Sequence, residues 1–174
     1  MNILPVIKFK RNNLGFTLVE LLVVIGILGI LAAALVATID PFEQIRRTND
    51  SDVKNTAVEY LTAVTRYYTT HTAFPWDAAP GGACNTSTAP AGVALSTAAM
   101  IGCTTVLTND GELKTTFASS ANLSKVFVAV NSGNPVVCFK PLSKSGILDP
   151  LNKYTVTGGA CATPSTSACY WCAQ

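Results

Sequence analysis

The sequence predicts an α+β protein. A long N-terminal helix, half membrane-spanning and half amphipathic, should pack on a small antiparallel β-sheet domain with disulfides. An apolar run occupies Leu21–Ile39, and an amphipathic helical pattern follows it. The later part of the chain is rich in Thr, Ser, Ala and Gly and holds all six cysteines. These observations divide the chain into an apolar N-terminal helix and a C-terminal domain with a small core, which we expect to be exported.

Composition and charge support this division. The chain has 174 residues, of which 49% are hydrophobic and 13% charged, and its mean hydropathy is +0.36. It is therefore too apolar for an ordinary soluble domain. Three of the twelve bases, Lys8, Lys10 and Arg11, precede Gly15, and no acid does. Without them nine bases face ten acids, so the excess positive charge is a topology signal. No specific nucleic-acid partner is predicted.

The run Leu21–Ile39 is long enough to cross a bilayer, which takes about 20 helical residues. A secretory signal has a shorter apolar core of roughly 7–15 residues before its cleavage site. Ala32–Ala34 could imitate such a site, but the run continues past it. We therefore expect a single membrane span. Glu20 stands at its head, where a carboxylate is costly unless it is protonated, paired or near water.

The stretch Gly15-Phe-Thr-Leu-Val-Glu20 and the apolar residues after it carry a specific pattern. A glycine ends a basic leader, Phe16 follows, and the fifth residue counted from Phe16 is Glu20. This pattern resembles the class III signal of type IV pilins and of their pseudopilin relatives in type II secretion. The resemblance implies that prepilin peptidase cuts between Gly15 and Phe16 and that Phe16 is N-methylated.

The same resemblance assigns a role to Glu20. In an incoming subunit it would face the Phe16 amine of a subunit already in the filament. An isolated amine and an isolated carboxylate are both costly in a low-dielectric bundle, and pairing relieves both costs. Gly26 and Gly29 could serve helix–helix packing or allow partial unwinding in a filament, and the sequence leaves both open.

The implied partners are prepilin peptidase, identical or related pilin subunits, an inner-membrane assembly platform and, before assembly, the lipid bilayer. The product would be an extracellular pilus or a periplasmic pseudopilus. The predicted division is a leader over 1–15, a transmembrane and filament-core helix over 16–39, an amphipathic half-helix over 40–72, and a disulfide-containing globular domain over 73–174.

Asp40-Pro41 ends the apolar run because Pro41 lacks an N–H group and disfavours a continuous helix. Asp40 can cap the next helix, with Pro41 in its first position. Apolar residues then recur on one helical face, while the charged residues, Asp50 among them, lie mostly on other faces. The predicted apolar face consists of Val53, Ala57, Tyr60, Leu61, Val64, Tyr67 and Tyr68. Phe74 and Trp76 are expected to anchor the turn that follows.

The segment Ala78–Thr105 is predicted to be a long surface loop with one short helical turn near Thr97–Ile101. Its Ala, Gly, Pro and Thr content favours irregular structure. Asn109–Glu112 resembles a capping box, so a short helix is expected from there to about Ala118.

Two strand-like runs follow, Lys125–Val130 and Val136–Lys140. They are joined by the turn residues Asn131–Pro135, which predict a hairpin. Tyr154–Thr157 and Ala168–Cys172 are weaker strand candidates. Together they predict the small antiparallel sheet.

An even number of cysteines in an exported, loop-rich domain indicates disulfides. We expect Cys84–Cys103, which closes the irregular loop, and leave the pairing of the other four open. A redox pair at Cys169-Tyr-Trp-Cys172 is disfavoured, because redox enzymes place this motif at a helix N-terminus. Export disfavours a zinc site. The remaining cysteines are Cys138, Cys161, Cys169 and Cys172.

No catalytic constellation is visible in the sequence, so we expect neither an enzyme nor a cofactor. His71, the single histidine, lies at a helix end, where interaction with the helix dipole or solvent is the ordinary role. Asp110, Glu112 and Asp149 are weak candidates for calcium. The signatures of calcium-binding pseudopilins are not evident, and no metal is predicted.

Three functions are consistent with these features. The first is a structural subunit of a type IV pilus-like filament, which the Thr- and Ser-rich, cysteine-rich tail favours. The second is a pseudopilin of a type II secretion or DNA-uptake system. The third is a membrane-anchored exported binding domain that never polymerises.

Overall fold

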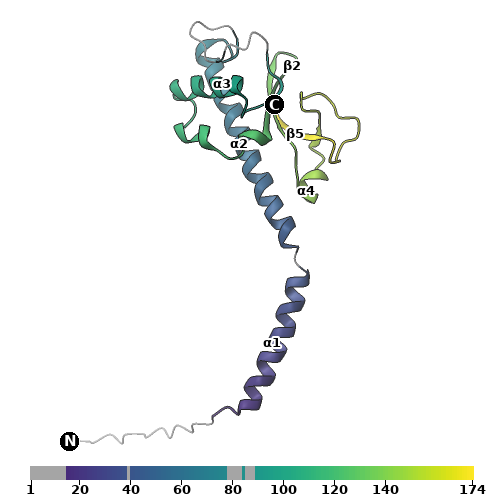
Figure 1. Cartoon of the computed structure of the whole chain (residues 1–174). Coiled ribbons are helices and arrows are strands. Elements are labelled where there is room, and N and C mark those ends of the chain that lie inside the picture. The colour runs from purple at the N-terminus through teal and green to yellow at the C-terminus, as the bar shows by residue number, and fades with distance from the viewer. Residues whose placement is uncertain (1–14, 39, 78–83, 85–88) are drawn as a thin grey trace, which may run out of the picture. The chain divides into compact units, whose positions relative to one another are not determined.

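A computed structural model of the chain describes residues 15–38, 40–77, 84 and 89–174 (Figure 1). The chain divides into two compact units, Met1–Asp40 and Pro41–Gln174, which we describe separately. The predicted leader, up to residue 14, lies outside the described residues, as does most of 78–88 in the predicted loop.

The described part of the first unit contains one helix, α1 (Leu18–Thr38). Its segment Leu18–Val36 is long and apolar enough to cross a membrane, and none of it is buried within the chain. The helix begins three residues before the predicted apolar run, because Thr17 and Glu20 form its first turn. Gly26 and Gly29 lie within α1, and a Cβ atom added at either would meet no atom within 4 Å.

The second unit is organised around α2 (Pro41–His71), which begins at Pro41 as predicted. Five of the seven residues of the predicted apolar face are buried, Leu61 is half-buried, and Tyr68 is 44% exposed. The first turns of α2 are mostly exposed and project from the domain (Figure 1). The helix ends where Thr72 adopts a positive φ of 53°. The five buried residues are Val53, Ala57, Tyr60, Val64 and Tyr67.

A five-stranded antiparallel sheet faces α2, in the order β1-β2-β3-β5-β4. The predicted α+β class with a small antiparallel sheet is therefore confirmed. The strands are β1 (Ala91–Ala94), β2 (Val126–Asn131), β3 (Asn134–Phe139), β4 (Asn152–Tyr154) and β5 (Tyr170–Ala173).

The predicted hairpin is present, but its turn is shorter than expected. Asn131 pairs with Asn134, so only Ser132 and Gly133 form the loop. Their φ angles are 51° and 83°, and two positive values are typical of the type I′ turn that fits twisted strands. Pro135 belongs to β3, opposite Val130. Three residues of the predicted turn, Asn131, Asn134 and Pro135, therefore belong to the strands.

The two weaker strand candidates are shifted. β4 covers Asn152–Tyr154, and the chain then turns, with the Gly158 N–H donating to the Thr155 carbonyl at 2.9 Å. The predicted strand at Tyr154–Thr157 is therefore wrong beyond its first residue. β5 begins at Tyr170, two residues later than the predicted Ala168.

The predicted loop Ala78–Thr105 is wrong over its described C-terminal part. It contains β1 and a full helix, α3 (Ala98–Asn109), instead of one short turn. Burial explains α3, because Met100, Cys103 and Leu107 are buried at helical spacing and their packing offsets the low helix propensity of the segment.

The predicted capping box at Asn109–Glu112 is also wrong. Asn109 is the last residue of α3, and Gly111 turns the chain with a φ of 80°. A 3-10 helix, η1 (Thr115–Ser119), then starts after Lys114. The described part of the domain has two further short helices, η2 (Leu123–Lys125) and α4 (Lys144–Ile147).

The core lies between α2, α3, η1 and the sheet. Tyr60 is fully buried, and its ring stacks on Phe117 with 6.0 Å between centroids. Burial raises the pKa of the Tyr60 phenol, and an interaction with Thr104 offsets only part of the rise. The Thr104 hydroxyl donates to the Met100 carbonyl, and the Tyr60 hydroxyl makes no hydrogen bond of good geometry with a described residue.

Candidate assembly site on α1

The surface of α1 is apolar on all sides. Every side chain described from Leu18 to Val36 is exposed, including Leu22, Ile30 and Leu35 at 60%, 73% and 65%. A helix that is hydrophobic all round belongs in a membrane or in the core of an assembly, because it has no polar face that water could solvate. The helix therefore needs lipid or other protein chains around it.

The N-terminal end of α1 carries the residues predicted for cleavage and assembly. Gly15, Phe16 and Thr17 precede the helix, and Phe16 is 88% exposed. Glu20 lies in the first turn. Its main-chain N–H donates to the Thr17 hydroxyl at 3.2 Å, while the Thr17 N–H and hydroxyl both donate to Glu20 Oε2 at 2.9 Å.

This reciprocal arrangement is a capping box, in which a threonine and the glutamate three residues later satisfy free N–H groups of the helix start. The role of Thr17 was missed at the sequence level, although the spacing Thr-x-x-Glu before an apolar run is its signal. Glu20 Oε2 receives both donors from Thr17, and Oε1 makes no hydrogen bond with a described residue. A carboxylate can accept at both oxygens, so Oε1 remains an acceptor for a cation.

The cysteines lie in the second unit, far along the chain from Glu20, and all six form disulfides. Cys84 is bonded to Cys103 on α3, which is the expected pairing. The other two bonds are Cys138–Cys172 and Cys161–Cys169. Cys169 and Cys172 are therefore bonded to different partners and not to each other.

Cys138 and Cys172 are direct partners across β3 and β5. Their bond links the last strand to the middle of the sheet. Cys161–Cys169 closes the loop between β4 and β5. The disulfides thus stabilise the part of the domain that has the least regular structure.

The weaker sequence candidates have structural partners. His71 stacks on Tyr67 with 4.0 Å between centroids, and its Nε2 lies 3.7 Å from Asp110 Oδ1. Its Nδ1 lies 3.2 Å from the Tyr67 carbonyl at the end of α2. Glu112 pairs with Arg66 Nε at 2.6 Å. Within the described residues, no group of three or more His, Cys, Asp or Glu side chains could hold a metal ion.

A second feature that was missed at the sequence level is a pair of carboxylates on α2, Glu43 and Asp50, which we call the carboxylate clamp. Asp50 accepts hydrogen bonds from the N–H groups of Leu142, at 2.9 Å, and Ser143, at 2.8 Å. Glu43 lies two helical turns before Asp50 on the same face, and its carboxylate accepts a hydrogen bond from the Lys144 N–H at 2.7 Å. The i, i+7 spacing of Glu43 and Asp50 is the available signal. The clamp fixes the segment that leads into α4 against the helix.

Comparison with known proteins gives one match. The family model of the prokaryotic N-terminal methylation motif matches residues 10–36, which include Gly15, Phe16, Glu20 and most of α1. No curated protein and no solved structure matches the chain. Residues 10–36 therefore carry the class III prepilin signal of type IV pilins and pseudopilins.

Proposed function

We propose that this chain is a prepilin, the precursor of a structural subunit of a type IV pilus-like extracellular filament. Prepilin peptidase cuts between Gly15 and Phe16 and methylates Phe16. The subunit waits in the membrane as a single-pass protein and is polymerised by an inner-membrane platform. It acts as a structural component and not as an enzyme.

One observation carries the proposal. α1 is a helix that is apolar on every side and unburied by its own chain, and most of it lies within the prepilin signal. Lipid can cover this surface before assembly. The same surface on neighbouring copies can cover it afterwards, by close packing of aliphatic side chains. A chain that only needed an anchor would not require the acidic residue at the head of this helix.

Cleavage also changes the electrostatics. It removes Lys8, Lys10 and Arg11 and creates a cationic amine at Phe16. Glu20 is held by Thr17 through Oε2, so Oε1 of an incoming subunit can accept a hydrogen bond from the Phe16 amine of a subunit already in the filament. Pairing of the two charges in the filament core would set the register of each subunit, while the aliphatic surface supplies cohesion.

Processing is tested by intact-mass and N-terminal analysis of the chain expressed with and without a prepilin peptidase. The expected product starts at Phe16 and is one methyl group heavier than the unmodified chain. A chain that keeps Met1, or that begins after Ala34, would contradict the proposal and favour the non-polymerising anchored domain.

Assembly is tested by Glu20→Ala and Glu20→Gln, with Glu59→Ala as the control on the exposed face of α2. Both Glu20 variants should be processed normally and yield at least tenfold fewer filaments, because the charge pair is lost while α1 stays apolar. The readout is the amount of chain in sheared surface fibres seen by electron microscopy. Normal fibres from Glu20→Gln would contradict the charge-pairing role.

The same fibres distinguish the two filament classes. Long surface fibres that contain this chain would identify a pilin. A chain that is processed and methylated but appears only in a short periplasmic assembly would identify a pseudopilin.

A further inference from the structure

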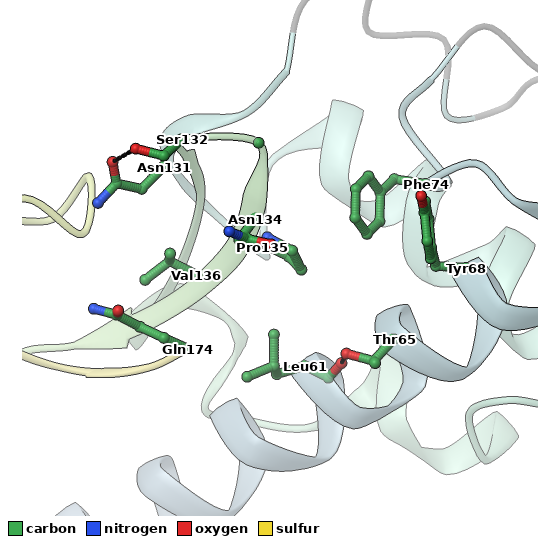
Figure 2. A pocket seen from close by; sticks show the side chains of 11 residues that line it. Leu61, Thr65, Tyr68, Phe74, Asn131, Ser132, Asn134, Pro135, Val136 and Gln174 are labelled. Atoms are coloured by element: carbon green, nitrogen blue, oxygen red, sulfur yellow. Dashed lines mark hydrogen bonds between the residues drawn. The ribbon is translucent and has the colours of Figure 1, made fainter.

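A pocket of about 640 Å³ lies between the C-terminal half of α2 and the β2–β3 hairpin (Figure 2). Neither the signal on α1 nor the disulfides involve it. Its volume is within the range of pockets that hold small organic ligands. It is lined by Leu61, Thr65, Tyr68, Phe74, Gln174 and residues 131–136.

One wall is aromatic and firmly held. The rings of Tyr68 and Phe74 stack with 4.6 Å between centroids, and Phe74 stacks on Trp76 at 5.2 Å. Trp76 is buried. The Asp77 carboxylate accepts a hydrogen bond from the Phe74 N–H at 2.9 Å, which fixes the turn that carries the ring. The pocket therefore has a preformed aromatic wall.

The opposite wall is polar. The Asn131 carboxamide donates to the Gly158 carbonyl at 2.9 Å, and the Ser132 hydroxyl donates to Asn131 Oδ1 at 3.3 Å. Figure 2 shows Asn131 and Ser132 on the far side of the hairpin from Phe74 and Tyr68. Asn134 and Gln174 are exposed, and no hydrogen bond joins either side chain to a described residue. Their carboxamides remain available to a ligand.

The chemistry of the lining selects the class of ligand. None of the described lining residues has an Asp, Glu, Lys, Arg or His side chain, so a charged ligand would find no charged side chain to pair with. An aromatic face packs well against apolar C–H surface. A carboxamide offers two N–H donors and one acceptor oxygen, which suits neighbouring hydroxyl groups that both donate and accept. A sugar ring presents both kinds of surface.

We propose that this pocket binds a neutral saccharide, with the stacked pair of Tyr68 and Phe74 in contact with the C–H surface of a sugar ring and the carboxamides of Asn134 and Gln174 bonded to its hydroxyl groups. The aromatic wall is already in place, so binding orders mainly the side chains of Asn134 and Gln174, which limits its entropic cost. This gives the domain a recognition function that goes beyond filament formation and does not depend on it.

The test uses the full chain in micelles of a phosphocholine detergent, because a detergent with a sugar head group would compete. Saturation-transfer NMR and titration would compare three groups of probes. These are neutral oligosaccharides of glucose, galactose, mannose and N-acetylglucosamine; oligomers of uronic acids; and a Thr- and Ser-rich peptide. We expect binding by at least one neutral oligosaccharide and by neither of the other groups.

Two variants locate the site. Tyr68→Ala should weaken binding about tenfold, equivalent to about 1.4 kcal/mol, and Asn134→Ala should weaken it severalfold. Asn134 lies at the end of an exposed turn, so its variant tests the site even if Tyr68→Ala fails to fold. Thr69→Ala is the matched control, because Thr69 is exposed on α2 beside Tyr68 but does not line the pocket.

Binding by none of the neutral oligosaccharides would overturn the proposal. So would preferential binding of the acidic oligomers or the peptide, or equal affinity in the native chain and Asn134→Ala. Glu20→Ala should bind the saccharide normally, so failure of filament assembly and failure of this site are distinguishable.

Discussion

Replacing Asp50 should destabilise the domain strongly although the residue lies on a largely polar face of α2. Its carboxylate holds two main-chain N–H groups, those of Leu142 and Ser143, at 2.8–3.1 Å. A hydrogen bond to a charged group contributes about 1.5–3 kcal/mol. Because Asp50 is half-buried, the lower value applies to each bond. Asp50→Ala should therefore lower the free energy of unfolding by about 3 kcal/mol.

Asp50→Asn keeps one acceptor oxygen without its charge. It should retain one ordinary hydrogen bond worth about 1 kcal/mol and lose about 2 kcal/mol. Asp52→Ala is the matched control, because Asp52 is exposed on the same helix and gains the same helix propensity from alanine. Its stability should change by less than about 0.5 kcal/mol.

The assay is urea unfolding in micelles, followed by tryptophan fluorescence. Trp171 lines the same pocket as Asp50, and its ring centroid lies 4.6 Å from Lys54 Nζ, so its emission should report release of the clamped segment. Equal stability of Asp50→Ala and Asp52→Ala would refute the clamp. An Asp50→Asn variant as stable as the native chain would refute the role of the charge.

Three further outcomes follow from the structure. Gly158→Ala should cost about 2–3 kcal/mol in chemical unfolding, because Gly158 has a φ of 80° and its new Cβ would lie 2.9 Å from Val136. Gly111→Ala, with the same φ and open space, should cost only about 1 kcal/mol, and equal losses would contradict the steric argument. Burial raises the pKa of Tyr60 above its ordinary 10.0, so its stabilising effect is complete below about pH 10 and falls as the pH rises above that value. In thermal melts, Tyr60→Phe should flatten this alkaline decline; an unchanged decline would exclude Tyr60 as its cause. Replacing Cys138 and Cys172 together by Ala should cost about 3.8 kcal/mol, since the bond closes a separation of 34 residues, and a loss below about 1 kcal/mol would contradict that account.

The parts of the fold that the sequence predicts best are those with strong periodic patterns. α2 was predicted almost to the residue, because Pro41 marks its start and its apolar residues recur on one face. The β2–β3 hairpin was predicted from two strand-like runs joined by the turn residues Asn131–Pro135, although the turn itself is only Ser132 and Gly133. α3 was not, because its buried stripe at Met100, Cys103 and Leu107 lies in a segment of low helix propensity.

The candidate assembly site was predicted from the resemblance to the class III signal, and the structure adds the reason for one part of it. Thr17 fixes Glu20 at the start of α1, which local spacing can reveal. Asp50 is different, because its partners lie 92 and 93 residues away. The i, i+7 spacing of Glu43 and Asp50 marks a shared helix face but does not identify those partners. The Cys138–Cys172 bond likewise depends on a strand register that pairing between distant segments creates.

The order of the disulfides along the chain has a consequence for biogenesis. Cys161–Cys169 is nested inside Cys138–Cys172. In the proposed topology the domain leaves the cytoplasm from its N-terminal side, so Cys138 meets an oxidising compartment together with Cys161, before Cys172 emerges. Oxidation in order of emergence would join Cys138 to Cys161, which is not the native pair. Native pairing therefore requires that Cys138 on β3 stays reduced until β5 has been exported, or that an isomerase exchanges the first bond by thiolate attack. Export of this subunit is thus coupled to the thiol–disulfide chemistry of the compartment that receives it.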